Sequence, residues 1–189
     1  SPYRLALTYL WACQLDDRVI GCPPQEANLL RKQWELGNFV ATSSMGRLFD
    51  VVSCLCGLCQ KVTFEGQAAM LLQNCYDVEE LGAYEFDQRW DVAELLTQVV
   101  ADVACRLSPG RISARFHRAL ARAIRLQTKA LGADRVGLTG GVFQNRQLLE
   151  LAVHELSQDG VEALWHRQIP PNDGGLSVGQ IAVAGARLS

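Results

Sequence analysis

Two adjacent glycines stand where an apolar run passes into a helical pattern, in the stretch RVGLTGGVFQNRQLL (residues 135–149). Because glycine has no Cβ, the backbone of Gly140 and Gly141 can adopt positive φ and come close to a bound ligand. Asn145, in the first helical turn, offers a hydrogen-bond donor and an acceptor, which suits the edge of a base or a ribose. The stretch is therefore compatible with nucleotide binding. It is also compatible with glycines that only turn the chain and an asparagine that caps the helix.

A carboxylate beside small residues forms the second candidate group, in SSMGRLFDVVSCLCG (residues 43–57). The large apolar residues follow helical spacing, whereas Asp50 shares another helix face with Gly46, Ser53 and Gly57. Side chains of a helix lean toward its N-terminus, so Asp50 leans over the bare backbone of Gly46. Such a carboxylate can receive two ribose hydroxyls. The alternative is a solvated aspartate with incidental glycines.

The third candidate group is IPPNDGGLSVGQ (residues 169–180), where Asp173 precedes the last helical pattern. Asp173 can cap that helix, or it can hold a cation at the carboxyl end of a strand. Small residues recur from Gly175 to Ala186, which predicts that this helix packs closely against a neighbour. The three histidines show no metal-ligand spacing, and no residue stands out as a general base, so the catalytic residues are left unknown.

The elements that position these groups change character near residue 134. The first 133 residues are predicted to be mostly helical, over 2–13, 23–37, 42–57, 65–75, 91–107 and 111–131, with a short strand or hairpin in 81–90. Residues 134–189 show a βαβα order: strands at 135–139 and 161–166, and helices at 145–158 and 174–188. This order implies a right-handed crossover and a parallel strand pair. Both glycine pairs follow the strands' carboxyl ends, where ligands of such sheets gather.

Composition narrows the classes of function. The chain has 189 residues and a net charge of −2, which argues against a dedicated nucleic-acid binder. No apolar run approaches the roughly 20 residues of a membrane span, so no membrane partner is expected. Of the seven cysteines, Cys54, Cys56 and Cys59 sit in an apolar helical run and are expected to be reduced core residues. An odd cysteine count and the absence of a signal peptide favour the cytoplasm.

Five ordered blocks resemble one family over essentially the whole chain. ATSSMGRLFDVV, FEGQAA, ARFHRALA, LTGGVFQNRQLLE and PPNDGGLSVGQ are similar, in this order, to the C-terminal part of the HypF family, the carbamoyltransferases of [NiFe]-hydrogenase maturation. A more distant resemblance is to the TsaD family, which transfers threonylcarbamoyl groups to tRNA, and to antibiotic carbamoyltransferases such as TobZ. The resemblance implies an α/β fold: one lobe of an actin-like, sugar-kinase-type ATPase, helix-rich with a small mixed sheet.

The resemblance also implies an activity and its ligands. Proteins of this family use carbamoyl phosphate and ATP, pass through a carbamoyl-adenylate, and carbamoylate the C-terminal cysteine of HypE during synthesis of the cyanide ligands of hydrogenase. The chain then supplies half of a nucleotide and metal cleft, and is expected to be inactive alone. Exposed apolar surface left without the other lobe makes self-association plausible. Two alternatives stay open: carbamoyl transfer to tRNA or to a small-molecule hydroxyl, and a non-catalytic lobe that docks HypE.

Site residues carry over position by position. Gly140, Gly141 and Asn145 match the nucleotide motif of the family, and Asp50 matches the aspartate that receives the ribose. The weaker match of Glu65 and Gly66, in FEGQ, continues the nucleoside pocket. Asp173 matches the aspartate that joins paired histidines in holding a divalent iron or zinc ion. Those histidines belong to the preceding lobe, and this chain has no such pair.

Overall fold

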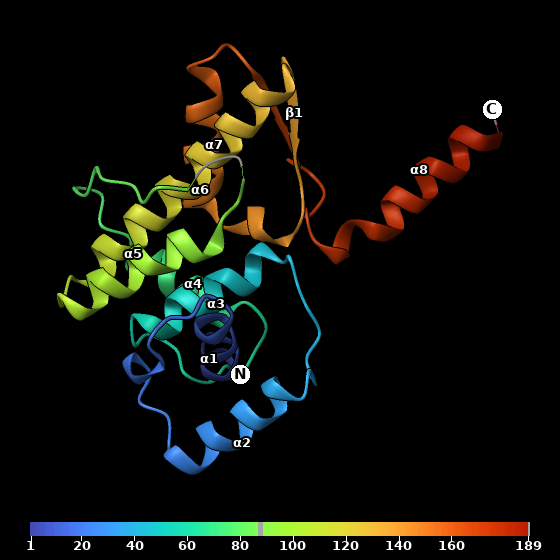
Figure 1. Ribbon diagram of the computed structural model, residues 1–189. Coiled ribbons are helices and arrows are strands. Elements are labelled where there is room, and N and C mark those ends of the chain that lie inside the picture. Colours follow the sequence, from blue (N-terminus) through green and yellow to red (C-terminus); the bar gives the residue numbers. More distant parts are fainter. Residues whose placement is uncertain (87–88, 189) are drawn as a thin grey trace. The chain divides into compact units, whose positions relative to one another are not determined.

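The structure is a computed structural model that describes residues 1–86 and 89–188 (Figure 1). It divides into two compact units, Ser1–Ala119 and Leu120–Ser189. The boundary lies within one long helix, α6 (Pro109–Leu131), upstream of the change in character predicted at residue 134. Among the described residues, no helix combines the length and the apolar character needed to cross a membrane.

The first unit is built from helices, in agreement with the predicted pattern. They are α1 (Pro2–Ala12), the 3-10 turn η1 (Asp17–Val19), α2 (Pro24–Glu35), α3 (Met45–Leu55), α4 (Gln67–Asn74), α5 (Val92–Ala104) and the start of α6. Local chemistry explains the helix starts. Pro24 opens α2, where its missing N–H costs nothing. The Asp91 carboxylate caps α5 by accepting from the N–H groups of Ala93 and Glu94.

Helix α3 lies at the centre of the first unit and packs against α1, α4 and α5. Leu48, Phe49, Val52 and Leu55 of its apolar stripe are buried, as the helical spacing predicts, whereas Met45 at the start of the helix and Cys56 after its end are only partly buried. Buried apolar residues of its neighbours include Leu7, Leu10, Leu72, Leu95 and Phe116. Each such side chain contributes roughly 1.5–3 kcal/mol on leaving water. All seven cysteines are free thiols, and Cys54 and Cys59 are buried in this core as expected. Burial raises the pKa of Cys54 to about 12, which keeps it protonated.

A buried carboxylate ties the segment after α4 to α6. Glu80 accepts from the N–H of Gly82 (2.8 Å) and from the Arg111 guanidinium (2.6 Å), with Arg115 at 3.2 Å. The hydrogen bond from the Gly82 N–H is the largest cause that lowers the pKa of Glu80, and the hydrogen bonds from the two arginines lower it further, to about 2. The strand or hairpin predicted in this region is absent from 81–86, because its N–H groups bond to Glu80 and to the Arg115 carbonyl instead. Residues 87–88 lie outside the described residues.

The second unit carries the βαβα order that the sequence predicts. It comprises the end of α6, β1 (Arg135–Leu138), the 3-10 turn η2 (Gly141–Gln144), α7 (Arg146–Ser157), β2 (Glu162–Trp165), the 3-10 turn η3 (Asp173–Gly175) and α8 (Leu176–Leu188). The two strands are parallel, and Leu138 pairs with Trp165 at their carboxyl ends. A small core of Ala121, Leu138, Ala152 and Leu156 holds α6, α7 and the sheet together.

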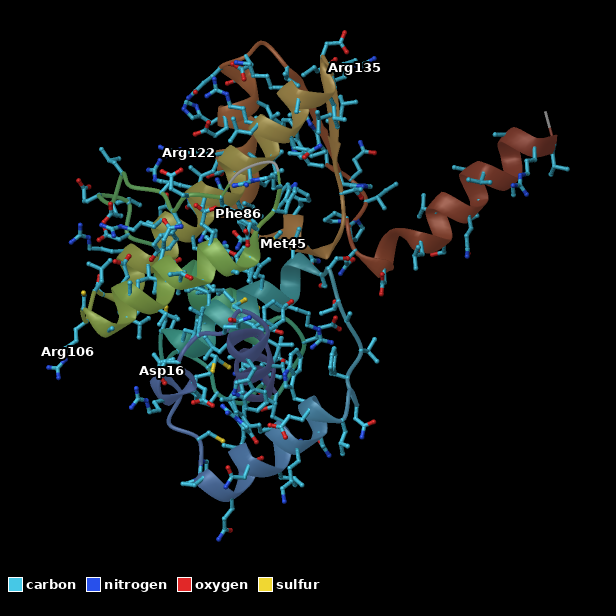
Figure 2. All side chains as sticks on the ribbon, in the orientation of Figure 1. Asp16, Met45, Phe86, Arg106, Arg122 and Arg135 are labelled. Carbon is cyan, nitrogen blue, oxygen red and sulfur yellow. The ribbon has the colours of Figure 1, made fainter. Side chains whose placement is uncertain are left out.

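Ion pairs fix α7 to the end of α6 on the outside of that core. Arg125 donates to both carboxylate oxygens of Asp159 (2.7 and 2.6 Å), and Arg122, labelled in Figure 2, lies 3.8 Å from Glu155. At the amino ends of the strands, Arg135 pairs with Glu162 at 2.7 Å. The opposite, carboxyl ends of the strands carry no such pair in the described structure and are left for the loops that follow.

Helix α8 departs from the prediction. The recurring small residues predict close packing, but none of the described residues of α8 is buried, and a Cβ added at Gly179 would meet no atom within 4 Å. Figure 1 shows α8 leading away from β1 and α7 of its own unit. The prediction that this helix packs closely against a neighbour is therefore wrong within the second unit, because no described element of that unit extends along it.

Candidate functional site

A pocket of about 950 Å³ opens where β1 and β2 end. It lies wholly within the second unit, and its walls are the residues after the strands, the loop before η3, and one face of α8. The lining includes Thr139, Gly140, Gly141, His166, Asn172, Asp173 and, on α8, Gln180 and Arg187. The carboxyl edge of a parallel sheet is where α/β proteins bind ligands, and this size suits a small organic ligand. The pocket therefore occupies the position that the strand order predicts.

Gly140 and Gly141, on the pocket wall, differ in whether the backbone requires glycine. Gly140 has φ +99° and ψ 158°, a conformation that is essentially restricted to glycine, and its N–H donates to the Pro171 carbonyl at 2.9 Å. Gly141 has no positive φ, and a Cβ added there would meet only the Asn172 Cβ, at 3.7 Å. The fold thus requires glycine at 140 but not at 141. At Gly141 the bare backbone leaves free space on the wall of the pocket.

Asn145 acts as a helix cap. Its side-chain oxygen accepts from the N–H of Leu148 at 2.9 Å, and the residue is buried at the start of α7. This is the simpler of the two interpretations of the sequence. Asn145 does not belong to the pocket lining, and its contact with a nucleoside stays a prediction.

The pocket also brings together two residues that the sequence analysis passed over for this site. Thr139 follows Leu138 and His166 follows Trp165, so the strand register sets them side by side. Thr139 Oγ1 and His166 Nε2 are 2.9 Å apart, within hydrogen-bonding distance. A sequence signal was available, because each is the last residue of a predicted strand, at its carboxyl end.

Asp173 lies on the pocket wall with an exposed carboxylate at the start of η3. The capping side chain of this turn is its neighbour Asn172, which accepts from the N–H of Gly174 at 3.1 Å. The Asp173 carboxylate therefore does not make the capping hydrogen bond of this turn and is available to a ligand. No group of three or more histidine, cysteine or acidic side chains that could hold a metal occurs among the described residues.

The remaining predicted residues belong to the first unit. Asp50 is half-buried on α3, and burial raises the pKa of its carboxyl while Arg47 opposes the shift. Glu65 and Gly66 are exposed before α4, where Gly66 has φ +80° and thus a backbone reason to be glycine. The prediction that Asp50 borders the same cavity as the pocket residues stays a prediction.

His117, one of the three histidines, is a core residue. It is completely buried against the rings of Phe49, Tyr76 and Phe116, and its Nδ1–H donates to the Ser113 carbonyl at 2.7 Å. Burial lowers its pKa to about 4, so the ring is neutral at physiological pH. Nothing in this environment suits a ligand contact.

Comparison with known families gives one match that covers nearly the whole chain. Residues 1–180 match the family model described as the carbamoyltransferase, Kae1-like domain, second subdomain. Among named relatives, the carbamoyltransferase HypF of Synechocystis sp. (strain PCC 6803) is 33% identical over 95% of this chain and 27% of its own length. The carbamoyltransferase HypF of Rhodobacter capsulatus is 34% identical over 100% of the chain and 26% of its own length.

Solved structures agree with these relatives. Full-length HypF, crystallised in a phosphate- and nucleotide-bound form, superposes with a TM-score of 0.86 and 34% identity over 99% of this chain and 26% of that protein. HypF of T. kodakarensis superposes with a TM-score of 0.80 at 23% identity, which supports the fold alone. The chain spans about a quarter of the length of the relatives that it matches.

Proposed function

Since the chain belongs to the carbamoyltransferase family with a Kae1-like domain, as that domain's second subdomain, we propose that it forms part of a HypF-type carbamoyltransferase. The proposed reaction uses carbamoyl phosphate and ATP, passes through a carbamoyl-adenylate, and transfers the carbamoyl group to the C-terminal cysteine of HypE in hydrogenase maturation. The observation that carries the proposal is the pocket at the strands' carboxyl ends, lined by Gly140, Gly141 and Asp173. The nucleotide-bound HypF structure adds support, because it superposes on the whole chain.

Each predicted site residue has a role in this proposal. The open wall at Gly141 admits the nucleotide phosphates, and Gly140 shapes the turn beside it. Asp50 accepts the ribose hydroxyls, a role that suits a half-buried carboxylate with weakened hydration. Asn145 with Glu65 and Gly66 completes the nucleoside surroundings. These groups bind and orient the reactants, so their contribution to the rate is positioning rather than proton transfer.

The residues that the structure describes do not form a metal site on their own. Asp173 offers one exposed carboxylate on the pocket wall, and the described residues contain no cluster of three acidic, histidine or cysteine ligands. A single carboxylate does not retain a divalent iron or zinc ion tightly. In the proposed enzyme Asp173 supplies one ligand to a metal held mainly by groups outside this chain.

The acceptor chemistry is nucleophilic acyl transfer. The cysteine thiolate of HypE attacks the carbonyl carbon of the carbamoyl-adenylate, a C–S bond forms, and AMP leaves with the electrons of the broken C–O bond. A thiolate is a strong nucleophile at neutral pH and needs no general base once it has formed. This fits a pocket in which no catalytic base has been identified.

A transfer assay tests the proposal. The full-length gene product is incubated with carbamoyl phosphate, ATP and HypE, and the carbamoyl group on the acceptor cysteine is detected by mass spectrometry. We expect the mass of one carbamoyl group on the C-terminal cysteine. Transfer to tRNA or to a small-molecule hydroxyl, with HypE unmodified, would contradict the proposed acceptor. Binding of HypE without any nucleotide binding would favour a docking role instead.

Two glycines provide a matched pair of variants. Gly141→Ala adds a methyl group on the pocket wall, whereas Gly137→Ala adds one on β1, outside the pocket; neither position has positive φ or a neighbour closer than 3.4 Å. We expect both variants to fold normally, because Ala fits both backbones. Transfer should fall at least about tenfold for Gly141→Ala and remain unchanged for Gly137→Ala. Equal activity of the two variants would remove Gly141 from the site.

A further inference from the structure

The hydrogen-bonded pair Thr139 and His166 is the feature of the pocket that the family motifs leave unexplained. The two residues follow β1 and β2 directly, and their side chains meet on the pocket wall, with Oγ1 and Nε2 2.9 Å apart. We propose that this pair binds the phosphate of the nucleotide: His166 positions the Thr139 hydroxyl, and Thr139 donates the hydrogen bond to a phosphoryl oxygen. The proposal deepens the proposed function and depends on it.

The pair has no evident role in stability. Both residues are exposed, and a hydrogen bond between exposed side chains contributes little because water competes for both partners. The strands are already held in register by the parallel pairing that ends at Leu138 and Trp165, and by the core beneath them. A 2.9 Å contact on a pocket wall that folding does not need is an arrangement that suits ligand binding.

The chemistry of the two groups fixes the direction of the bond. A phosphoryl oxygen is an acceptor, so the group that contacts it must donate. When His166 Nε2–H donates to Thr139 Oγ1, the threonine hydroxyl proton is free to point at the ligand. Donation to an anion also strengthens the bond from His166, because a chain of hydrogen bonds polarises its members. Thr139 immediately precedes Gly140 and Gly141, where the phosphates are proposed to lie.

The other polar groups of the pocket are less suited to this task. The Asn172 oxygen already accepts from the N–H of Gly174, and the Asp173 carboxylate repels an anion. Arg187 is cationic but lies eleven residues after Leu176, about 16 Å along α8 from the start of the helix. Asn172 and Gln180 also carry amide donors in the lining, but Thr139 is the donor that adjoins the glycines in the chain and has a partner, His166, to orient it.

Calorimetry on the full-length gene product tests the proposal with four variants. Thr139→Val removes the hydroxyl at nearly constant shape, His166→Ala removes the positioning group, and the double variant combines the changes. His166→Gln restores a donor. Each protein is titrated with ATP, adenosine and carbamoyl phosphate. The matched control is His154→Ala, which alters an exposed histidine on α7 outside the pocket. Circular dichroism and thermal melting establish that each variant is folded.

We expect Thr139→Val and His166→Ala each to weaken ATP binding by about tenfold and to leave adenosine binding unchanged. The double variant should be no weaker than the single ones, because both changes remove the same interaction. His166→Gln should recover most of the affinity, and His154→Ala should match the wild type.

Several results would overturn the proposal. Additive losses in the double variant would mean that the two residues act separately, and equal losses for ATP and adenosine would mean a general effect on the pocket. If the variants weakened the binding of carbamoyl phosphate alone, the pair would bind that phosphate and not the phosphate of the nucleotide. A wild-type protein that binds ATP while all four variants behave like it would reject the pair but leave the proposed function intact. A wild-type protein that binds no nucleotide would reject both.

Discussion

The buried His117 gives the first unit a stability that depends on pH. In the unfolded chain the imidazole has its ordinary pKa of 6.5, whereas burial in the folded chain lowers the pKa to about 4. Between these two values the unfolded chain binds a proton that the folded chain does not, so acid favours unfolding. The stabilisation is therefore complete above about pH 6.5 and is lost progressively as the pH falls toward about 4.

The magnitude follows from the size of the shift. Each pKa unit corresponds to about 1.4 kcal/mol, so a shift from 6.5 to about 4 corresponds to roughly 3 kcal/mol in full. Between about pH 7.5 and about pH 5 only part of the proton uptake occurs, and the free energy of unfolding should fall by about 2 kcal/mol. The causes of this shift are burial, which lowers the pKa, and the Ser113 hydrogen bond, which raises it.

Urea titration at the two pH values measures the effect. Tryptophan fluorescence follows the unfolding of the first unit, because that unit contains Trp11, Trp34 and Trp90. His117→Gln removes the titrating group but keeps a side-chain donor, so its unfolding free energy should not show the loss of about 2 kcal/mol. His154→Gln, at an exposed position, is the control and should behave like the wild type.

Comparing the wild type with His117→Gln cancels the contributions of other titrating groups to the pH dependence of stability. Burial raises the pKa of Asp50, so this carboxyl has the opposite effect and stabilises the folded chain as the pH falls. The wild type and His117→Gln share that contribution, and the difference between them isolates the histidine. Parallel pH dependences in the two proteins would refute the reasoning, whatever their absolute stabilities.

Three further predictions concern stability and association. Glu80→Gln should lower the free energy of unfolding by about 2 kcal/mol in a urea titration, because a buried hydrogen-bonded carboxylate between arginines is lost. Gly110→Ala should destabilise by a similar amount, since the added Cβ would lie 2.6 Å from the Cys75 carbonyl oxygen. The isolated chain should self-associate through the exposed apolar face of α8. Ile181→Glu should therefore reduce the weight-average mass measured by sedimentation equilibrium, whereas Leu36→Glu, at an equally exposed position of the first unit, should leave that mass unchanged.

Each of these has a result that counts against it. Unchanged urea midpoints for Glu80→Gln would mean that the ion pairs with α6 do not contribute to stability. A stable Gly110→Ala protein would mean that the start of α6 can shift away from α4 at no cost. Equal effects of Ile181→Glu and Leu36→Glu would locate self-association elsewhere than α8.

Residue pattern alone predicted much of the fold. The helical periods before residue 134 correspond to α1–α6, and most of the apolar stripe of α3, from Leu48 to Leu55, is buried as its spacing predicts. The strand–helix–strand order after 134 predicted the parallel pairing of β1 and β2, because a crossover helix leaves no simpler arrangement. Periodicity and turn residues are local properties of the chain, so they can be recognised without tertiary structure.

Tertiary structure showed local contacts of the site residues that the sequence left open. Asn145 could cap a helix or contact a ligand, and only the coordinates place its oxygen 2.9 Å from the Leu148 N–H. The two glycines look alike in sequence, yet only Gly140 has a backbone conformation that demands glycine. The contact between Thr139 and His166 depends on the register of strands separated by a helix. The sequence thus determined the elements and the edge where a ligand would bind, whereas side-chain roles there depended on distances between segments far apart in the chain.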